Sequence, residues 1–233
     1  MQSDRTVVKF APVQHQSAPL RNKIIAVLRS AIETGVLAPG TRLIEKNLCD
    51  QLNVSRTSLR EALRELQAEG IFEPMSVRGL VINTISREDA ENAYRIRSVL
   101  EGLVVEQLID KADIEGVLDL TRQGEVLKRA YQAGRLETII EAKRAFYDRI
   151  CTGADNVIAF DIINRLVLRT SSLRRYSLSR KERQLQSIEE IDRLIKAIQK
   201  RDIETARQAA LEHVRNSALS ALGAAERRSE TVS

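Results

Sequence analysis

The segment from Ile44 to Gly70 restricts the fold more strongly than any other part of the chain. It predicts two short helices joined by a tight turn, because Asn53 tolerates the left-handed backbone conformation that such a turn needs. Ser55 is a good N-cap for the second of these helices, and Gly70 ends it. The apolar residues of that helix fall on one face, which is expected to be buried: Leu59, Ala62, Leu63 and Leu66.

The flanking segments extend this pattern in both directions. An amphipathic helix is expected before it, ending at Gly35, and Pro39-Gly40 then makes a turn. The apolar stripe of that helix consists of Leu20, Ile24, Val27, Leu28, Ala31 and Ile32. After Gly70, the run IFEPMSVRGLVIN alternates around a turn at 76–79, which predicts a two-stranded hairpin. Helix, helix, tight turn, helix and hairpin together make a winged helix-turn-helix.

In a helix-turn-helix, the helix after the tight turn enters the major groove of DNA, and its first residues meet base edges. Arg56 and Arg60 lie four residues apart and so share one face of that helix. Arginine is the best bidentate partner for guanine, and the hydroxyls of Thr57 and Ser58 can donate to phosphates or bases. Arg64 lies one turn further on and could equally be a surface residue.

The competing interpretation is a solvated helix, in which Arg56 and Arg60 pair with Glu61, Glu65 or Glu69. The overall charge of residues 20–83 does not distinguish the two interpretations, because this segment has nine Lys/Arg and seven Asp/Glu. However, the acidic residues fall mostly after Arg60, so the front of the helix stays basic. Combined with the turn, the cap and the hairpin, this distribution favours contact with DNA.

The rest of the chain predicts helices alone. Aromatic residues make up 3% of the 233 residues and Trp is absent, so a core must be built from Leu, Ile, Val and Ala, which favours helix packing. The expected organisation is a flexible arm at 1–18, the winged helix-turn-helix at 19–83, a helical domain at 84–225 and a polar tail at 226–233. The helical domain should begin with a long helix capped by Ser86 and Asp89. Its later helices are expected at about 114–132, 135–152, 156–178, 182–200 and 202–225. The predicted fold class is therefore mainly α, an N-terminal winged helix-turn-helix followed by a C-terminal all-helical bundle.

Charge, hydropathy and cysteine usage limit the partners, the compartment and the metal or disulfide sites that can be expected. A net charge of +5 and a pI near 9.4 permit an anionic partner without demanding one. No apolar run approaches the roughly 18 residues of a membrane helix, and residues 1–10 lack a signal-peptide core, so a cytoplasmic protein without membrane contact is expected. Cys49 and Cys151 lie far apart, and their spacing suggests neither a zinc site nor a disulfide framework.

Residues 37–70 resemble the DNA-binding domain of GntR-type bacterial transcription regulators. The resemblance rests on PG-x-x-L, then VSR-T-x-x-REAL-x-x-L, then EG, and it extends over about 60 residues. One departure is Ser58, where the family usually has proline. The resemblance implies operator contacts by Arg56, Thr57, Ser58 and Arg60. It further implies a contact by Lys46 and a wing tip at Arg78 and Gly79 that approaches the minor groove.

The helical part resembles the FCD-type effector domain of the FadR subfamily. The matching segments are YRIRSVLE at 94–101, EAKRAFYDRICTGADN at 141–156 and IDRLIKAIQKRDIETARQAALEHV at 191–214. Many such domains bind a divalent metal through an Asp, a His four residues later and two further His. Lys143, Tyr147 and Ile191 stand at three of these positions, and His213 remains. These residues have the wrong charge and too few ligands for a metal, so neither a metal nor another cofactor is expected. Lys143 could take the place of the cation.

By alignment with this domain, Arg97, Lys143, Tyr147 and His213 are the candidate effector-binding residues. Together they would make a cationic cavity suited to a carboxylate or a phosphate. Alternatives remain for three of them: His213 could be a hydrogen-bonded structural residue, Arg97 could pair with Glu101, and Lys143 could be exposed. The basic run 174–183 is interpreted as a solvated helix end, with a second contact to DNA or to a ligand as the alternative.

The resulting hypothesis is a homodimeric, DNA-binding regulator, by family habit a repressor, that binds a palindromic operator and is released by a small anionic effector. The alternative is a DNA-binding regulator whose C-terminal domain only dimerises. An enzyme is not expected, because the sequence offers no nucleophile–base pair and no phosphate loop, and its histidines are His15 and His213.

Overall fold

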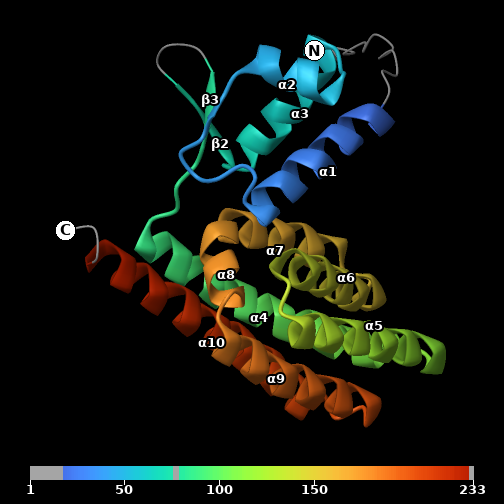
Figure 1. Ribbon diagram of the computed structural model, residues 1–233. Coiled ribbons are helices and arrows are strands. Elements are labelled where there is room, and N and C mark those ends of the chain that lie inside the picture. Colours follow the sequence, from blue (N-terminus) through green and yellow to red (C-terminus); the bar gives the residue numbers. More distant parts are fainter. Residues whose placement is uncertain (1–17, 76–78, 231–233) are drawn as a thin grey trace, which may run out of the picture.

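The computed structural model describes residues 18–75 and 79–230, and it divides into a small N-terminal domain that rests on one end of a helical bundle (Figure 1). Most of the expected arm at 1–18 and the end of the expected tail therefore lie outside the described residues. The N-terminal domain holds α1 (Ala18–Thr34), β1 (Arg42–Leu43), α2 (Glu45–Leu52), α3 (Arg56–Ala68), β2 (Phe72–Pro74) and β3 (Leu80–Ile82).

The helix-turn-helix of α2 and α3 forms as its local sequence predicts. Asn53 follows α2 with φ 51° and ψ 50°, in the left-handed region, and its N–H donates to the carbonyl of Cys49. The Ser55 hydroxyl accepts the backbone N–H of Ser58, which caps α3. Gly70 follows α3 with φ 73°. The four residues expected on the inner face of α3 are all buried.

The wing contains one strand more than expected. β2 and β3 pair antiparallel, with Phe72 opposite Ile82, which confirms the hairpin. β1 adds to the other edge of β3, with Arg42 opposite Val81, so the sheet order is β1-β3-β2. Two residues are too few to show an alternating pattern, so β1 could not be predicted from the sequence. Most of the turn of the hairpin, including Arg78, lies outside the described residues.

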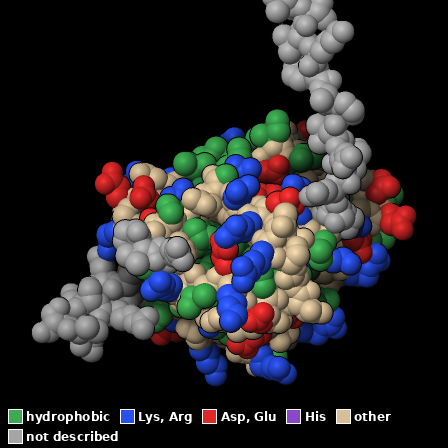
Figure 2. Space-filling view, turned by 90° about the horizontal axis from the view of Figure 1, so that it is seen from above, with side chains coloured by type: hydrophobic (Ala, Val, Ile, Leu, Met, Phe, Trp, Pro, Cys, Tyr) green, Lys and Arg blue, Asp and Glu red, His purple; other side chains and the backbone are tan. Residues whose placement is uncertain are grey.

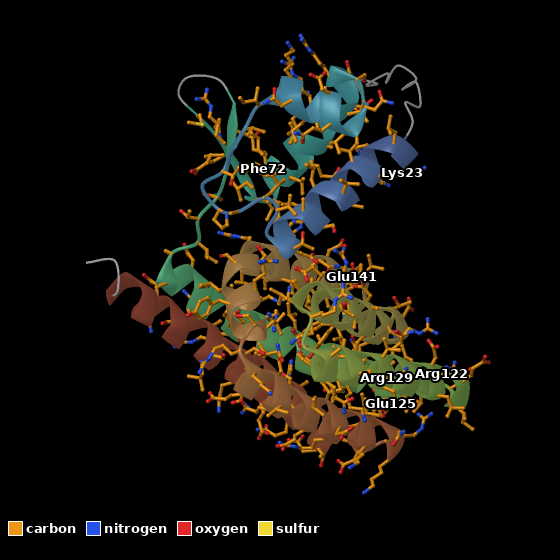
Figure 3. The ribbon with its side chains drawn as sticks, in the orientation of Figure 1. Lys23, Phe72, Arg122, Glu125, Arg129 and Glu141 are labelled. Carbon is orange, nitrogen blue, oxygen red and sulfur yellow. The ribbon has the colours of Figure 1, made fainter. Side chains whose placement is uncertain are left out.

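The core of the N-terminal domain is formed by one face of α1, the inner face of α3 and the sheet. Phe72 lies in this interior, whereas Lys23 points outward from α1 (Figure 3). The stripe expected on α1 was partly wrong: Leu20 and Val27 are 38% and 50% exposed, and Ile25 is buried beside Ile24. The buried face of α1 is thus centred on Ile24, Leu28 and Ile32, which turns Val27 toward the solvent.

The C-terminal domain is a bundle of helices. Its members are α4 (Arg87–Lys111), α5 (Ile114–Ala133), α6 (Leu136–Ala154), α7 (Val157–Arg169), α8 (Ser171–Leu178), α9 (Lys181–Gln199) and α10 (Ile203–Glu230). Ser86 caps α4 and exchanges hydrogen bonds with Asp89, as expected. The long helices α4 and α10 run side by side, and α5, α6 and α9 complete the aliphatic core (Figure 1).

Two helix boundaries differ from the prediction. The single helix expected over 156–178 is two helices, because the chain bends at Thr170, whose buried hydroxyl donates to the carbonyl of Leu166. In addition, α10 continues to Glu230, past its expected end near 225, since its last residues are good helix formers. None of the described helices is long and apolar enough to cross a membrane.

The two domains meet where α1 lies on α6, α7 and α8 (Figure 1). Leu168, near the end of α7, is 2% exposed and belongs to the apolar cluster of the N-terminal domain. On the same side, Arg144 of α6 donates to the carboxylate of Glu33 in the last turn of α1, at 3.0 Å. The junction thus combines an apolar contact with an ion pair.

Candidate DNA-binding surface and polar cavity

A groove at the free end of the N-terminal domain brings together residues of α2, α3 and the wing. Its lining includes Lys46, Arg56, Arg60 and Gly79, all predicted to contact DNA, as well as Arg42. Seen from this end, Lys and Arg side chains form a row across the surface (Figure 2). Such a row supplies the positive potential that attracts a phosphate backbone.

The arginines of α3 are not neutralised by the glutamates of their own helix. Arg56 is exposed and forms no hydrogen bond or ion pair with another described side chain. Arg60 is held by Glu45 of α2, with 2.8 Å between Nε and Oε2. Glu65 and Glu69 pair instead with arginines of α1, Arg21 at 3.4 Å and Arg29 at 2.6 Å. The helix front therefore stays basic and accessible.

Smaller groups complete this surface. Thr57 is exposed, while Ser58 is half-buried and its hydroxyl lies 3.0 Å from that of Ser55, within the helix cap. Gly79 has φ 114°, and a Cβ there would lie 3.0 Å from the carbonyl oxygen of Leu43. A side chain at Gly79 would thus strain the backbone and crowd β1, which explains glycine at the base of the wing.

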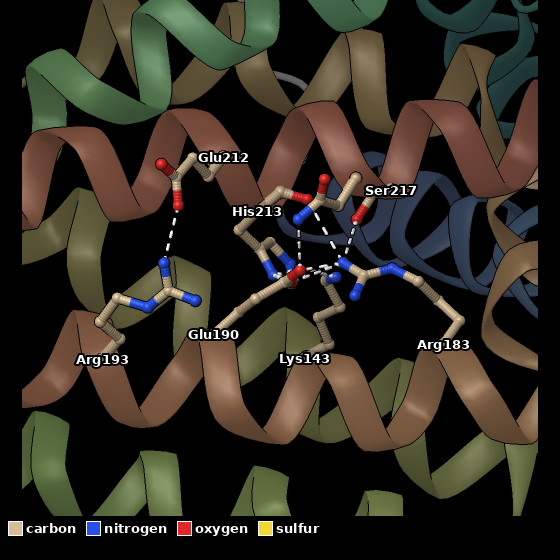
Figure 4. A network of polar contacts seen from close by, with 8 residues as sticks. Lys143, Arg183, Glu190, Arg193, Glu212, His213 and Ser217 are labelled. Atoms are coloured by element: carbon tan, nitrogen blue, oxygen red, sulfur yellow. Dashed lines mark hydrogen bonds and ion pairs between the residues drawn. The ribbon is translucent and has the colours of Figure 1, made fainter.

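Inside the helical domain, α6, α9 and α10 contribute to a buried polar network around His213 of α10 (Figure 4). His213 Nδ1 lies 2.6 Å from Glu190 Oε2, and Nε2 lies 2.8 Å from Lys143 Nζ. Because the carboxylate can only accept, Nδ1 carries the proton, and Nε2 accepts from Lys143. Arg183 also donates to Glu190, at 2.6 Å, and to the Ser217 hydroxyl, at 3.1 Å.

Burial sets the charges of this network. Burial, together with the cations Lys143 and Arg183, lowers the pKa of His213 to about 3 against the pull of Glu190, so the imidazole is neutral at pH 7. Burial alone would raise the pKa of Glu190, but hydrogen bonds and charges from His213 and Arg183 lower it to about 2. Burial and the charges of Arg174, Arg183 and Arg97 lower the pKa of Lys143 well below its usual range.

This arrangement does not fit the metal that the FCD resemblance implies for many members. An ammonium group already binds the imidazole nitrogen that a metal ion would need. Tyr147 and Ile191 supply no carboxylate or imidazole, and within residues 18–75 and 79–230 no group of three His, Cys, Asp or Glu could hold a metal ion.

A small cavity opens next to Lys143, between α4, α6, α7, α8 and the end of α1. Its volume is about 30 Å³, and three of the four candidate effector residues line it, namely Arg97, Lys143 and Tyr147. The fourth, His213, lies behind Lys143, with its ring stacked 6.2 Å from that of Tyr147. Apolar residues form part of the wall: Cys151, Phe160, Ile163 and Val167.

The cavity is lined with polar atoms that lack partners. Arg97 pairs with Glu101 at 2.6 Å, as one alternative anticipated, and both side chains are almost fully buried. Yet Arg97 Nη1, Glu101 Oε2 and the Tyr147 hydroxyl have no hydrogen-bond partner among the described residues. Unpaired buried polar groups are costly, so several of them around one cavity indicate a place that water or a ligand fills.

Arg174 also lines this cavity, although the sequence suggested a solvated helix end for the run 174–183. That interpretation was wrong for Arg174 and Arg183, because the bend at Thr170 turns α8 so that Arg174 faces α4 and α6, and Arg183 joins the His213 network. The Arg174 guanidinium has no hydrogen-bonding or ion-pair partner within the part of the chain that the structure describes. Burial and the nearby Arg97 lower the pKa of Arg174, which shows a cation short of negative charge.

The comparisons with known proteins agree with both halves of this picture. The family model of the FCD domain matches residues 92–216, more than half of the chain, and that of the bacterial regulatory proteins of the gntR family matches residues 20–82. The chain is a GntR-family regulator with an FCD domain. This family comprises transcription regulators and not enzymes.

Individual relatives of this GntR-family regulator cover most of it. The HTH-type transcriptional regulator YdhC of Bacillus subtilis is 28% identical over 80% of the chain and 84% of its own length. The HTH-type transcriptional repressor RspR of Escherichia coli is 26% identical over 84% of the chain and 86% of its own length. The solved structure of Escherichia coli McbR/YncC superposes with a TM-score of 0.76 and 25% identity, covering 84% of the chain and 93% of that structure.

Proposed function

We propose that this GntR-family regulator is a cytoplasmic repressor that binds a palindromic operator as a homodimer and is released by a small anionic effector. DNA-binding regulation follows from the family. Repression is supported by relatives that are named repressors, among them RspR. The anionic effector is supported by one observation above all: Arg174, a half-buried cation that forms no hydrogen bond or ion pair with a described side chain, faces a cavity.

The proposed DNA contacts are divided between base edges and backbone. Arg56, the basic side chain of the first turn of α3 without a partner in the described structure, is assigned to base edges in the major groove. Arg60, positioned by Glu45, reads a neighbouring base or phosphate. The remaining residues contact phosphates or the minor groove from α2, the start of α3 and the wing: Lys46, Thr57, Ser58, Arg78 and Gly79.

The same cavity argues against a domain that only dimerises. A bundle with that role alone needs an aliphatic interior, whereas here Arg97 and Lys143 are 2% and 4% exposed and face a cavity. Buried charged groups with unsatisfied polar atoms, such as Arg97 Nη1 and Glu101 Oε2, destabilise the fold, so their presence favours a ligand that compensates them. Tyr147 adds a hydroxyl donor to the same lining.

A comparison of Arg174→Ala with Arg169→Ala tests the effector site. Arg169 is an exposed arginine at the end of α7 and serves as the control for lost positive charge. A panel of small carboxylates and phosphates is screened for release of the wild-type protein from an operator selected in vitro. Arg174→Ala should bind the operator normally and lose the response, while Arg169→Ala keeps it. If Arg174→Ala responds like the wild type, the cavity is not the effector site.

The proposed dimer face lies on α4. Ile96, Val99 and Leu103 recur at helical spacing on this helix and are 51%, 65% and 38% exposed. A contiguous apolar stripe of this kind on a soluble helix marks a protein contact. Val99→Glu should therefore convert the dimer to a monomer in analytical ultracentrifugation. Ile158→Glu, on the equally exposed start of α7, should leave the dimer intact. If Ile158→Glu is a monomer and Val99→Glu stays a dimer, the interface lies on α7 instead of α4.

A further inference from the structure

We propose that Glu33 of the DNA-binding domain is a tethered carboxylate that a free monocarboxylate effector displaces from the polar cavity, which releases α1 from the helical domain. This inference rests on the proposed function, because it specifies the ligand class of that cavity and how its occupation reaches the DNA-binding domain. It concerns the cavity residues of α1, α4, α6, α7 and α8.

Glu33 reaches the cavity from the neighbouring domain. It lies in the last turn of α1 and is 9% exposed, and its Oε1 accepts from Arg144 Nη1 at 3.0 Å. Of the described residues that line the cavity, Glu33 alone belongs to the N-terminal domain. Its negative charge acts on Arg174 as well as on Arg144. Glu33 therefore supplies part of the negative charge that the cavity's arginines lack.

The cavity must open before it can hold an effector. A volume of about 30 Å³ has room for one or two water molecules, not for a metabolite. Most of its wall belongs to tightly packed helices of one domain, which resist expansion. The side closed by Glu33 is different, because Arg144 is 40% exposed there and the contact joins two domains. Widening the cavity on this side moves α1, which is packed directly against α3.

The lining selects one chemical class of ligand. Arg97, Arg144 and Arg174 offer guanidinium groups for one carboxylate. Phe160, Ile163 and Val167 offer an apolar wall for a short hydrocarbon body. A second anionic group would meet the other acids of the cavity, Glu101 and Asp148, which disfavours dicarboxylates and phosphates. The fitting ligand is a monocarboxylate with a short apolar body.

Butyrate and its uncharged analogue butyramide are suitable probes of this competition. Their affinities are measured by isothermal titration calorimetry on the full-length wild type, Glu33→Gln and Glu141→Gln. Glu141 is an exposed acid of α6 near the domain junction and outside the cavity, so it controls for the lost charge (Figure 3). Hydrogen exchange of α1 amides, with and without butyrate, reports whether α1 stays docked.

If Glu33 competes with the ligand, Glu33→Gln binds butyrate roughly fivefold more tightly than the wild type, the factor expected from one partly exposed ion pair. Butyrate should raise hydrogen exchange in α1 of the wild type, and Glu33→Gln should show this raised exchange without ligand. Glu141→Gln should behave like the wild type, and butyramide should have no effect on any of the three.

Two results would overturn the inference. Equal butyrate affinity of the wild type and Glu33→Gln, with equal α1 exchange, would show that Glu33 does not compete. Absence of butyrate binding to both proteins would reject the ligand class. In either case the proposed effector function is tested separately, by the operator-release screen. That function stands if another anion releases the wild type from the operator but does not release Arg174→Ala.

Discussion

At the scale of single residues, the network around His213 makes stability depend on pH. The pKa of His213 is about 3 in the folded protein against 6.5 for a free histidine, so the unfolded chain binds a proton below pH 6.5 that the folded chain rejects. Stability is thus intact above pH 6.5 and falls as the pH decreases toward 3. Glu190, with a pKa of about 2 against 4.5, adds a loss of the same sign only below pH 4.5.

The prediction is that lowering the pH from 7.5 to 5 costs the wild type about 2 kcal/mol more unfolding free energy than it costs His213→Gln. Glutamine can still accept from Lys143 but does not titrate. The measurement is urea unfolding of both proteins at the two pH values. An equal loss in both would mean that His213 is protonated, and paired with Glu190, in the folded state.

Arg56 and Arg64 provide a second comparison at this scale. Both are exposed arginines of α3, but only Arg56 lies in the basic groove with Lys46 and Arg60. Arg56→Ala should weaken specific operator binding by about 1–3 kcal/mol, the value of one bidentate base contact, and relax the preference at one base pair. Arg64→Ala should change binding little. Fluorescence anisotropy with matched and single-mismatch operators checks this, and similar losses for both variants would indicate phosphate contacts alone.

At the scale of elements, the end of α1 depends on a glycine. Gly35 has φ 79°, and a Cβ there would lie 2.5 Å from the Arg175 side chain of α8. Gly40 has nearly the same φ, 78°, but no atom within 4 Å of its added Cβ. Both alanine variants bear the backbone strain of about 1 kcal/mol, and Gly35→Ala must in addition displace Arg175. We therefore expect Gly35→Ala to be the less stable variant in urea unfolding; equal losses would show that Arg175 moves freely.

Elements with a cap or a special turn residue were predictable from sequence, and elements set by contacts with distant parts of the chain were not. Ser55, Asn53 and Ser86 are cap or turn residues that mark helix boundaries in the local sequence, so α3 and α4 were located correctly. The strand β1 exists because β3 lies beside it, and the bend at Thr170 exists because α8 must pass under α1. Arg174 was misjudged for the same reason: a basic residue at a helix start looks solvated until the fold turns it inward.

The same limit applies to the candidate site. The resemblance to FCD domains suggested Arg97, Lys143 and Tyr147, and these three residues line the cavity. It could not indicate Glu33, which lies far away in sequence and reaches the cavity only through the packing of the two domains. A site shared between domains leaves no local pattern in either of them.

At the scale of the whole molecule, the junction decides whether the two domains behave as one unit. Leu168 extends from α7 into the apolar cluster of the N-terminal domain, beside Ile32 of α1. A ligand that opens the cavity can affect DNA binding only if this junction transmits the motion of α1. The strength of the Leu168 contact should therefore be visible in the cooperativity of unfolding.

Leu168→Ala removes a buried side chain from this junction and should cost about 2–4 kcal/mol, mainly in the N-terminal domain. Leu127→Ala makes the same truncation in the core of the helical domain, away from the junction. In differential scanning calorimetry, Leu168→Ala should split the transition, with the N-terminal domain unfolding first and α1 losing its hydrogen-exchange protection, because the domains are no longer coupled. Leu127→Ala should lower the stability of the helical domain without raising exchange in α1. A single, merely shifted transition for Leu168→Ala would mean that the Glu33–Arg144 pair and the remaining contacts suffice to couple the domains.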